Sequence, residues 1–264
     1  MRRRRGRNIV LRVEMPNVSI GRVRPEIEQL EKSAKEAKGI SRELERAQRE
    51  VYRWAKQWKP SEALRVVHEQ AVAEVLQSRT AKEWRREEKR WLGALPEERA
   101  AMLKKFFPRL AKIYKIAVPR MVVEKQDKGA WAYATQQDKA RANGSWGDIG
   151  FGYERPLKQE PKEDFGPENR AWLAKGNKLV LRRSGYLYAV SVLLHEFAHV
   201  HQYHCMKETS AGRRFPQDTR MFKLVARAAV AFEYPSHHEC SPTEIDSNWP
   251  ERNFAAEMTK ALGR

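Results

Sequence analysis

Apolar positions divide the chain into two regions of different character. Over residues 21–115 apolar residues are sparse and recur at a spacing closer to 3.5 than to 2, which predicts a series of polar, basic helices. Pro25 and Pro60 suit the first turns of helices that begin there, and Pro108 is expected to kink or break a later one. Residues 1–20, which begin MRRRRGRN, are predicted to form a flexible basic arm.

The second region, residues 116–264, combines short β-rich stretches with strongly apolar helices. Its strand candidates are bounded by Gly, Pro, Asn and Lys, and they read RMVVEKQ, AWAYATQQ, DIGFGYE and NKLVLR. A helix from Tyr186 to Met206 follows, and because it is apolar nearly all round it is predicted to be buried. Further helices are expected at MFKLVARAAVAFEY and at roughly residues 243–261. This order predicts an α+β fold in which a small sheet packs on one long central helix.

Composition adds an uneven charge to this picture. The chain has 52 Lys and Arg against 34 Asp and Glu, a net charge of +18, and residues 1–115 alone carry +14. Such an asymmetry favours a polyanionic partner such as nucleic acid, although a solvated basic surface explains it equally well. Trp84 and Trp91 are seven residues apart and share one helix face, which favours a role in packing over stacking on bases.

The cysteine content and the absence of long apolar runs indicate the compartment. Cys205 and Cys240 are too few for a disulfide framework. The sequence has no run of eighteen apolar residues, and its N-terminus lacks the apolar core of a signal peptide. These features predict an intracellular, cytoplasmic protein with no membrane partner.

Candidate chemistry is concentrated in the predicted buried helix, where residues 193–205 read LLHEFAHVHQYHC. His195 and His199 are four residues apart, so their imidazoles lie about 40° apart around a helix and one turn apart along it. Both can then reach one metal ion, and Glu196 lies on the adjoining face beside a metal-bound water. This is the geometry of an HExxH zinc helix. The alternative interpretation is a set of core histidines that bond to carbonyl groups.

A zinc ion held in this way would lower the pKa of its water to about 7 and polarise a carbonyl group. Glu196 would take the proton of the water and later deliver it to the leaving amine. The pattern HExxHxxGxxH is not met, because Gln202 and Cys205 occupy its glycine and third histidine positions. His201 and His204 are expected to point away from the metal, either on the surface or beside the ligands.

The downstream segment SPTEIDSNWPERNFAAEM resembles the gluzincin class of zinc metallopeptidases, and in particular its small cytosolic members. In that class a glutamate on a second helix completes the site, often in an E-x-x-x-D/N pattern followed by Phe-Ala, and HEFAH is a typical first motif. The resemblance covers roughly residues 175–260. It implies that Glu244 is the third zinc ligand and that Asn248 is a hydrogen-bond partner of one histidine. Asp246 is an alternative ligand.

The loop sequence HHEC keeps a second resemblance open. In SprT-like proteases, which act on DNA-bound proteins, a downstream histidine is the third ligand, so His237, His238 or Cys240 could take that place. The same histidines, or Tyr234, could instead stabilise an oxyanion. DIGFGYE or NKLVLR could pair with an extended substrate as an edge strand.

Together these features predict a zinc-dependent peptidase of the HExxH type, with Zn2+ as cofactor. Its expected substrate is a protein or peptide, and the basic region extends this expectation to proteins associated with nucleic acid. The expected organisation is a basic arm at 1–20, a basic helical region at 21–115 and a zincin-like domain at 116–264. The alternative is a nucleic-acid-binding or structural protein with a non-catalytic zinc site. Replacing Glu196 by Gln separates the two, because only a peptidase would lose turnover while it keeps its zinc.

Overall fold

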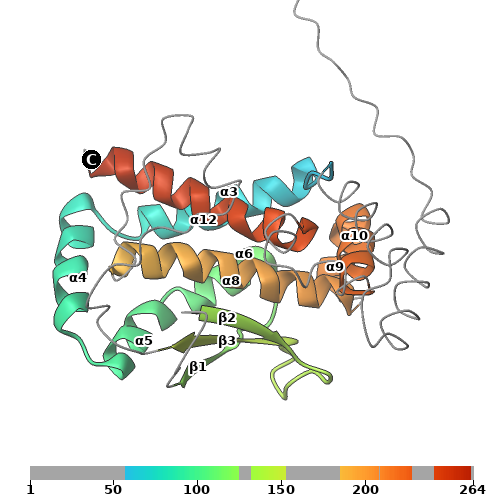
Figure 1. Ribbon diagram of the computed structural model, residues 1–264, viewed down its shortest axis with the longest axis horizontal. Coiled ribbons are helices and arrows are strands. Elements are labelled where there is room, and N and C mark those ends of the chain that lie inside the picture. Colours follow the sequence, from blue (N-terminus) through green and yellow to red (C-terminus); the bar gives the residue numbers. More distant parts are fainter. Residues whose placement is uncertain (1–56, 125–131, 153–184, 208, 228–240, 263–264) are drawn as a thin grey trace, which may run out of the picture.

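The computed structural model of the protein describes residues 57–124, 132–152, 185–207, 209–227 and 241–262 (Figure 1). Within these ranges the fold is α+β, as predicted, with helices and one small sheet. Its elements are, in chain order, α3 (Glu62–Gln77), α4 (Ala81–Gly93), α5 (Pro96–Lys104), α6 (Phe107–Tyr114), β1 (Arg120–Glu124), β2 (Ala132–Gln136), β3 (Gly147–Gly152), α8 (Tyr186–Met206), α9 (Ser210–Arg214), α10 (Pro216–Arg227) and α12 (Pro242–Ala261). The arm, residues 21–56, NKLVLR and the HHEC loop lie outside the described residues.

The described sheet has three strands in the order β1-β3-β2. β1 runs parallel to β3, and β2 runs antiparallel to it, with Ala134 opposite Ile149. β3 is the segment predicted as DIGFGYE, and it pairs on both sides. It therefore has no edge to offer to an extended substrate, which removes one of the two predicted candidates for that role.

Helix α8 runs through the centre of the molecule, and its bounds are those predicted from its apolar pattern. The sheet lies along one side of α8, and α12 and α3 lie along the other (Figure 1). Contact between sheet and helix is close at Gly147, where an added Cβ would lie 3.0 Å from the Tyr203 ring and 3.2 Å from the Val200 side chain. Both surfaces of α8 are thus covered, which explains why its sequence is apolar nearly all round.

The helices before the sheet share one hydrophobic core with α8 and α12. Phe107 packs edge to face on Phe197 of α8, with 5.0 Å between ring centroids. Trp84 lies 5.8 Å from both Tyr186 and Phe254, and Trp84 and Trp91 are each 2% exposed, which confirms their predicted packing role. The described helices on the two sides of the predicted boundary at residues 115 and 116 therefore contribute to the same core.

Two prolines act differently from each other. Pro108 stands in the first turn of α6, after a break that separates this helix from α5, as the sequence predicts. Pro250 lies inside α12 without ending it, although it removes one intrahelical N–H donor. Among the described helices, none has the length and apolar character required to cross a membrane.

Candidate metal centre

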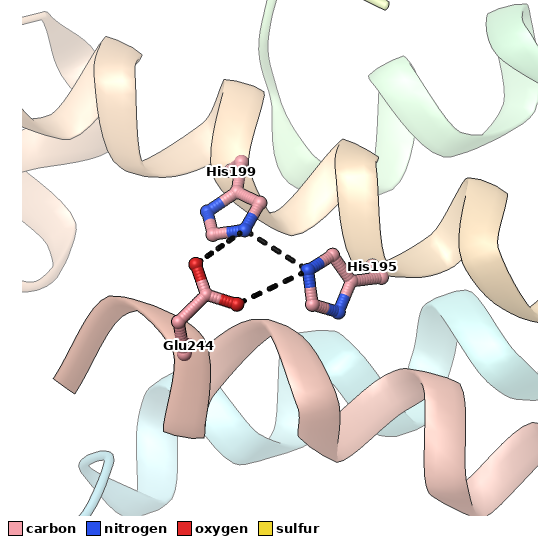
Figure 2. Close-up of side chains that lie close together, drawn as sticks. All are labelled: His195, His199 and Glu244. Atoms are coloured by element: carbon pink, nitrogen blue, oxygen red, sulfur yellow. Dashed lines mark hydrogen bonds and ion pairs between the residues drawn. The ribbon is translucent and has the colours of Figure 1, made fainter. Parts of the chain in front are cut away.

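Three side chains from α8 and α12 converge on one point (Figure 2). His199 Nε2 lies 3.0 Å from His195 Nε2, and the two oxygens of Glu244 lie 3.4 Å from His195 Nε2 and 3.2 Å from His199 Nε2. The side chains are 12–15% exposed, so the point is shielded yet reachable from solvent. The structure thus brings together the three residues that the sequence predicts as ligands.

The size of this triangle fits a zinc ion. Zinc bonds of about 2.0–2.1 Å to nitrogen and oxygen, at tetrahedral angles, place neighbouring ligand atoms about 3.3 Å apart. The observed separations of 3.0, 3.2 and 3.4 Å lie around that value. Two imidazoles and one carboxylate are also a ligand set of catalytic zinc sites, which leave one position open for water or substrate.

Gln202 fixes the tautomer of His199. The amide nitrogen of Gln202 donates to the Thr243 carbonyl at 2.9 Å and to Asp246 Oδ2 at 2.8 Å, so its oxygen must face His199. That oxygen lies 3.0 Å from His199 Nδ1 and can only accept, which places the imidazole proton on Nδ1. The lone pair on Nε2 of His199 therefore points into the site.

Glu251 has the same effect on His195. Its carboxylate oxygen lies 3.1 Å from His195 Nδ1 and accepts a hydrogen bond from the N–H of that nitrogen. Nε2 of His195 then also carries a lone pair that points into the site. Partners of this kind hold the rings of metal-binding histidines and raise their basicity.

When both rings are neutral, two imidazole nitrogens and a carboxylate face one another, and a positive charge between them stabilises this arrangement. The Ser247 hydroxyl lies 3.3 Å from His195 Nε2, and it also bonds to the backbone carbonyl of Glu244 at 3.2 Å. A metal cation satisfies all three at once, which makes this cluster a candidate metal centre.

The pKa values describe the same electrostatic pattern. Burial alone would lower the pKa of His195, but its hydrogen bonds to Glu244 and Glu251 raise that pKa well above its usual value. Burial would raise the pKa of Glu244, yet the two histidines hold it well below its usual value. The site thus stabilises a negative charge on Glu244 and a positive charge beside it.

Glu196 lies next to the cluster on α8 and is 6% exposed. Burial raises the pKa of its carboxyl group, and the neighbouring His195 and His199 lower it in part. The carboxylate makes no hydrogen bond or ion pair with another described residue, so it is available to a water or a substrate at the site. This is the place and the environment that a general base requires.

The other predicted site residues have different positions. Asp246 turns away from the cluster, towards His68 and Gln202, and is not placed as the third ligand. Asn248 was predicted to bond to one of the two histidines. Instead, Glu251 bonds to His195 and Gln202 bonds to His199. The remaining alternatives lie outside the described residues: Tyr234, His237, His238 and Cys240.

His201 and His204 point away from the cluster, as predicted, but they are buried in the core and lie neither on the surface nor beside the ligands. Burial lowers the pKa of His201 to about 3, and its ring packs against Tyr114 and Phe215 with centroids 5.1 and 5.4 Å away. Burial lowers the pKa of His204 to about 4, and its Nε2 accepts the backbone N–H of Trp146 at 3.2 Å. Both side chains are neutral parts of the core.

Two partners of the ligands were missed by sequence reasoning, although helix periodicity contains a signal for each. Gln202 is three residues after His199, and Glu251 is seven after Glu244, so each shares a helix face with its ligand. Extending the predicted ligand face by about one turn on α8 and about two turns on α12 would have found both.

Comparisons with protein-family models, with curated proteins and with solved structures found no match to this chain. The metal centre is therefore inferred from its own geometry.

Proposed function

We propose that this protein is a zinc-dependent peptidase with a zincin-like arrangement of its site. One observation carries the proposal: two histidine lone pairs and a carboxylate, each histidine held by its own partner, converge beside the buried carboxylate of Glu196. A purely structural zinc site is usually closed by four protein ligands. Here the described residues supply three, together with a candidate base.

His195, His199 and Glu244 would hold the zinc ion. Zinc, when bound, lowers the pKa of a coordinated water to about 7 and polarises the substrate carbonyl. Glu196 takes the proton from the attacking water on its carboxylate and then delivers it to the nitrogen of the leaving amine. Because burial raises the pKa of Glu196 above its usual value, the protonated form needed for this second transfer is easier to reach.

The third ligand supports the gluzincin-like version of this proposal. Glu244 occupies the first turn of α12, where the Ser241 hydroxyl accepts its backbone N–H at 3.2 Å. This N-cap fixes the turn that carries the ligand. The positive end of the helix dipole also favours a carboxylate at that position.

The prediction that the substrate is associated with nucleic acid rests on charge alone. Residues 1–56 contain 16 Lys and Arg and 8 Asp and Glu, so they carry +8 of the +14 of residues 1–115. The segment that would provide most of the contacts therefore lies outside the described residues.

The decisive experiment measures zinc content and peptide hydrolysis in the wild type and in Glu196→Gln. A library of quenched fluorescent peptides provides a substrate without knowledge of the natural one. We expect about one zinc per chain in both proteins and a loss of turnover of about 10²–10⁴-fold in Glu196→Gln, the usual contribution of general acid–base catalysis. Glu87→Gln is the matched control, because it neutralises a buried carboxylate on α4 and should leave turnover unchanged.

A protein that binds zinc but hydrolyses no peptide, or a Glu196→Gln variant with full turnover, would contradict the peptidase proposal. The non-catalytic zinc site predicted as the alternative would then be the better description.

A further inference from the structure

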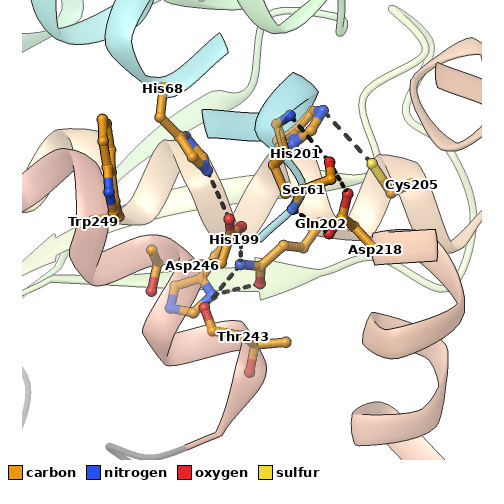
Figure 3. Close-up of polar contacts among 12 residues, drawn as sticks. Ser61, His68, His199, His201, Gln202, Cys205, Asp218, Thr243, Asp246 and Trp249 are labelled. Atoms are coloured by element: carbon orange, nitrogen blue, oxygen red, sulfur yellow. Dashed lines mark hydrogen bonds and ion pairs between the residues drawn. The ribbon is translucent and has the colours of Figure 1, made fainter. Parts of the chain in front are cut away.

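A buried chain of hydrogen bonds runs from α6 and α3 to the metal centre (Figure 3). The Tyr114 hydroxyl lies 2.9 Å from His68 Nδ1, and His68 Nε2 lies 2.7 Å from Asp246 Oδ1. The other oxygen of Asp246 accepts from Gln202, which in turn holds His199. His68, Gln202 and Asp246 are all 0% exposed.

The protons in this chain have one consistent arrangement. The carboxylate of Asp246 accepts from both sides, so His68 carries its proton on Nε2, and its Nδ1 accepts from the Tyr114 hydroxyl. Burial raises the pKa of Tyr114 well above its usual value, so this hydroxyl keeps its proton. Every hydrogen bond then points towards Asp246, which leaves the Gln202 oxygen as the acceptor for His199.

We propose that His68, Asp246 and Gln202 form a positioning relay that holds His199 in its metal-binding tautomer. Helix α3 is then part of the metal centre, although His68 and Asp246 are 178 positions apart in the sequence. This inference rests on the metal site of the proposed function, but it does not depend on peptide hydrolysis. It gives the helices before the sheet a role at the site that differs from nucleic-acid binding.

The hydrogen bonds of the relay are not needed merely to attach α3 to the rest of the fold. A second buried carboxylate, Asp218 of α10, already binds the start of α3, because its two oxygens accept from the backbone N–H and the hydroxyl of Ser61 at 3.0 and 2.6 Å. A buried ionised group is costly, and apolar residues of similar volume often stabilise a core at least as well. What distinguishes Asp246 from Asp218 is its second oxygen, which binds the partner of a metal ligand.

The test compares zinc affinity in the full-length wild type and three variants, by competition with a chromophoric zinc chelator. Gln202→Met keeps the shape and charge of the side chain but removes the acceptor for His199. His68→Phe removes the link to α3. Asp218→Asn is the matched control, since it alters a buried carboxylate that contacts α3 but lies outside the relay. Circular dichroism and urea unfolding establish that each variant is folded.

We expect Gln202→Met to weaken zinc binding about 10–100-fold, the usual effect of removing a partner of a metal ligand. His68→Phe should weaken it less, and Asp218→Asn should leave it unchanged even where the stability falls. If Gln202→Met does not fold, Gln202→Leu replaces it in the same comparison. If zinc affinity falls in proportion to the free energy of unfolding in all three variants, these residues have a merely structural role and the relay is overturned.

Other results separate the inference from the proposed function. Wild-type zinc affinity in folded Gln202→Met overturns the relay and leaves the peptidase proposal intact. An effect in Gln202→Met with none in His68→Phe overturns the part played by α3. Zinc binding that follows the expected order in a protein without peptidase activity supports the relay and contradicts the proposed function. A wild type that binds no zinc overturns both.

Discussion

Helix α8 carries four histidines, and its two pairs have opposite properties. The pKa values of His195 and His199 are raised, whereas those of His201 and His204 are lowered to about 3 and about 4. All four are shielded by the fold, so burial alone does not distinguish them. The first pair faces the carboxylates of α12, and the second faces aromatic rings and backbone groups.

The comparison shows that the partner residues decide what a histidine on this helix can do. A burial penalty disfavours the charged form of every imidazole, and only a nearby negative charge or a cation offsets it. His195 and His199 have such an environment because Glu244 and Glu251 lie on the α12 face opposite them. The sequence HEFAHVHQYH therefore contains one pair that faces carboxylates and one pair that lies in the core.

The largest expected effect is a difference in zinc content between variants that each replace one histidine of one pair. His199→Ala should lower the zinc content from about one equivalent to nearly none, because the two remaining ligands bind the ion weakly. His201→Leu should keep the full equivalent, although it changes the core packing around Phe215. Metal analysis of the purified variants by mass spectrometry measures both contents.

Full zinc in His199→Ala would show that the metal lies elsewhere in the chain. Loss of zinc in a folded His201→Leu would show that the two pairs are not independent.

Removing the metal should have the next largest effect. A ligand that binds only the folded state and is present at 100 to 1,000 times its Kd stabilises the fold by about 2.7 to 4.1 kcal/mol. We expect a chelator to lower the free energy of unfolding by about this amount in the wild type and in His201→Leu. His199→Ala should show no such dependence. Urea unfolding with and without chelator is the measurement, and an equal loss in His199→Ala would contradict the site.

What the sequence predicted correctly depends on local patterns. The bounds of α8 follow from an uninterrupted apolar run, and His195 and His199 meet because four residues make about one helical turn. Glu244 came from a resemblance, and the fold brings it to the same point.

What could not be predicted depends on contacts between distant segments. His68 meets Asp246 across 178 positions, and a lone histidine on a helix contains no signal of such a partner. The apolar stripes of α3 to α6 likewise showed that these helices pack, but not that they pack on α8 and α12 in one core. Periodicity gives the buried face of a helix and leaves its partner open.

The smallest expected effect is a pH dependence of opposite sign for the two pairs. The pKa of His204 falls from 6.5 to about 4 on folding, so the unfolded chain binds more protons below pH 6.5 and stability falls as the pH falls. At pH 5 this loss is about 2 kcal/mol relative to pH 8, because a tenfold change in proton affinity is worth about 1.4 kcal/mol. In the zinc-free protein the pKa of His195 is raised instead. Its contribution to the free energy of unfolding is therefore fully present below pH 6.5 and is lost as the pH rises.

His204→Gln isolates the first of these effects. The glutamine oxygen can accept the Trp146 N–H as His204 does, but it cannot be protonated in this range. Urea unfolding of the zinc-free protein at pH 5 and pH 8 should therefore show a smaller loss in His204→Gln, by about 2 kcal/mol. If the variant loses as much stability in acid as the wild type, His204 is not held neutral by the fold. The contrast between the two pairs on α8 would then rest on His201 alone, whose pKa burial lowers further, to about 3.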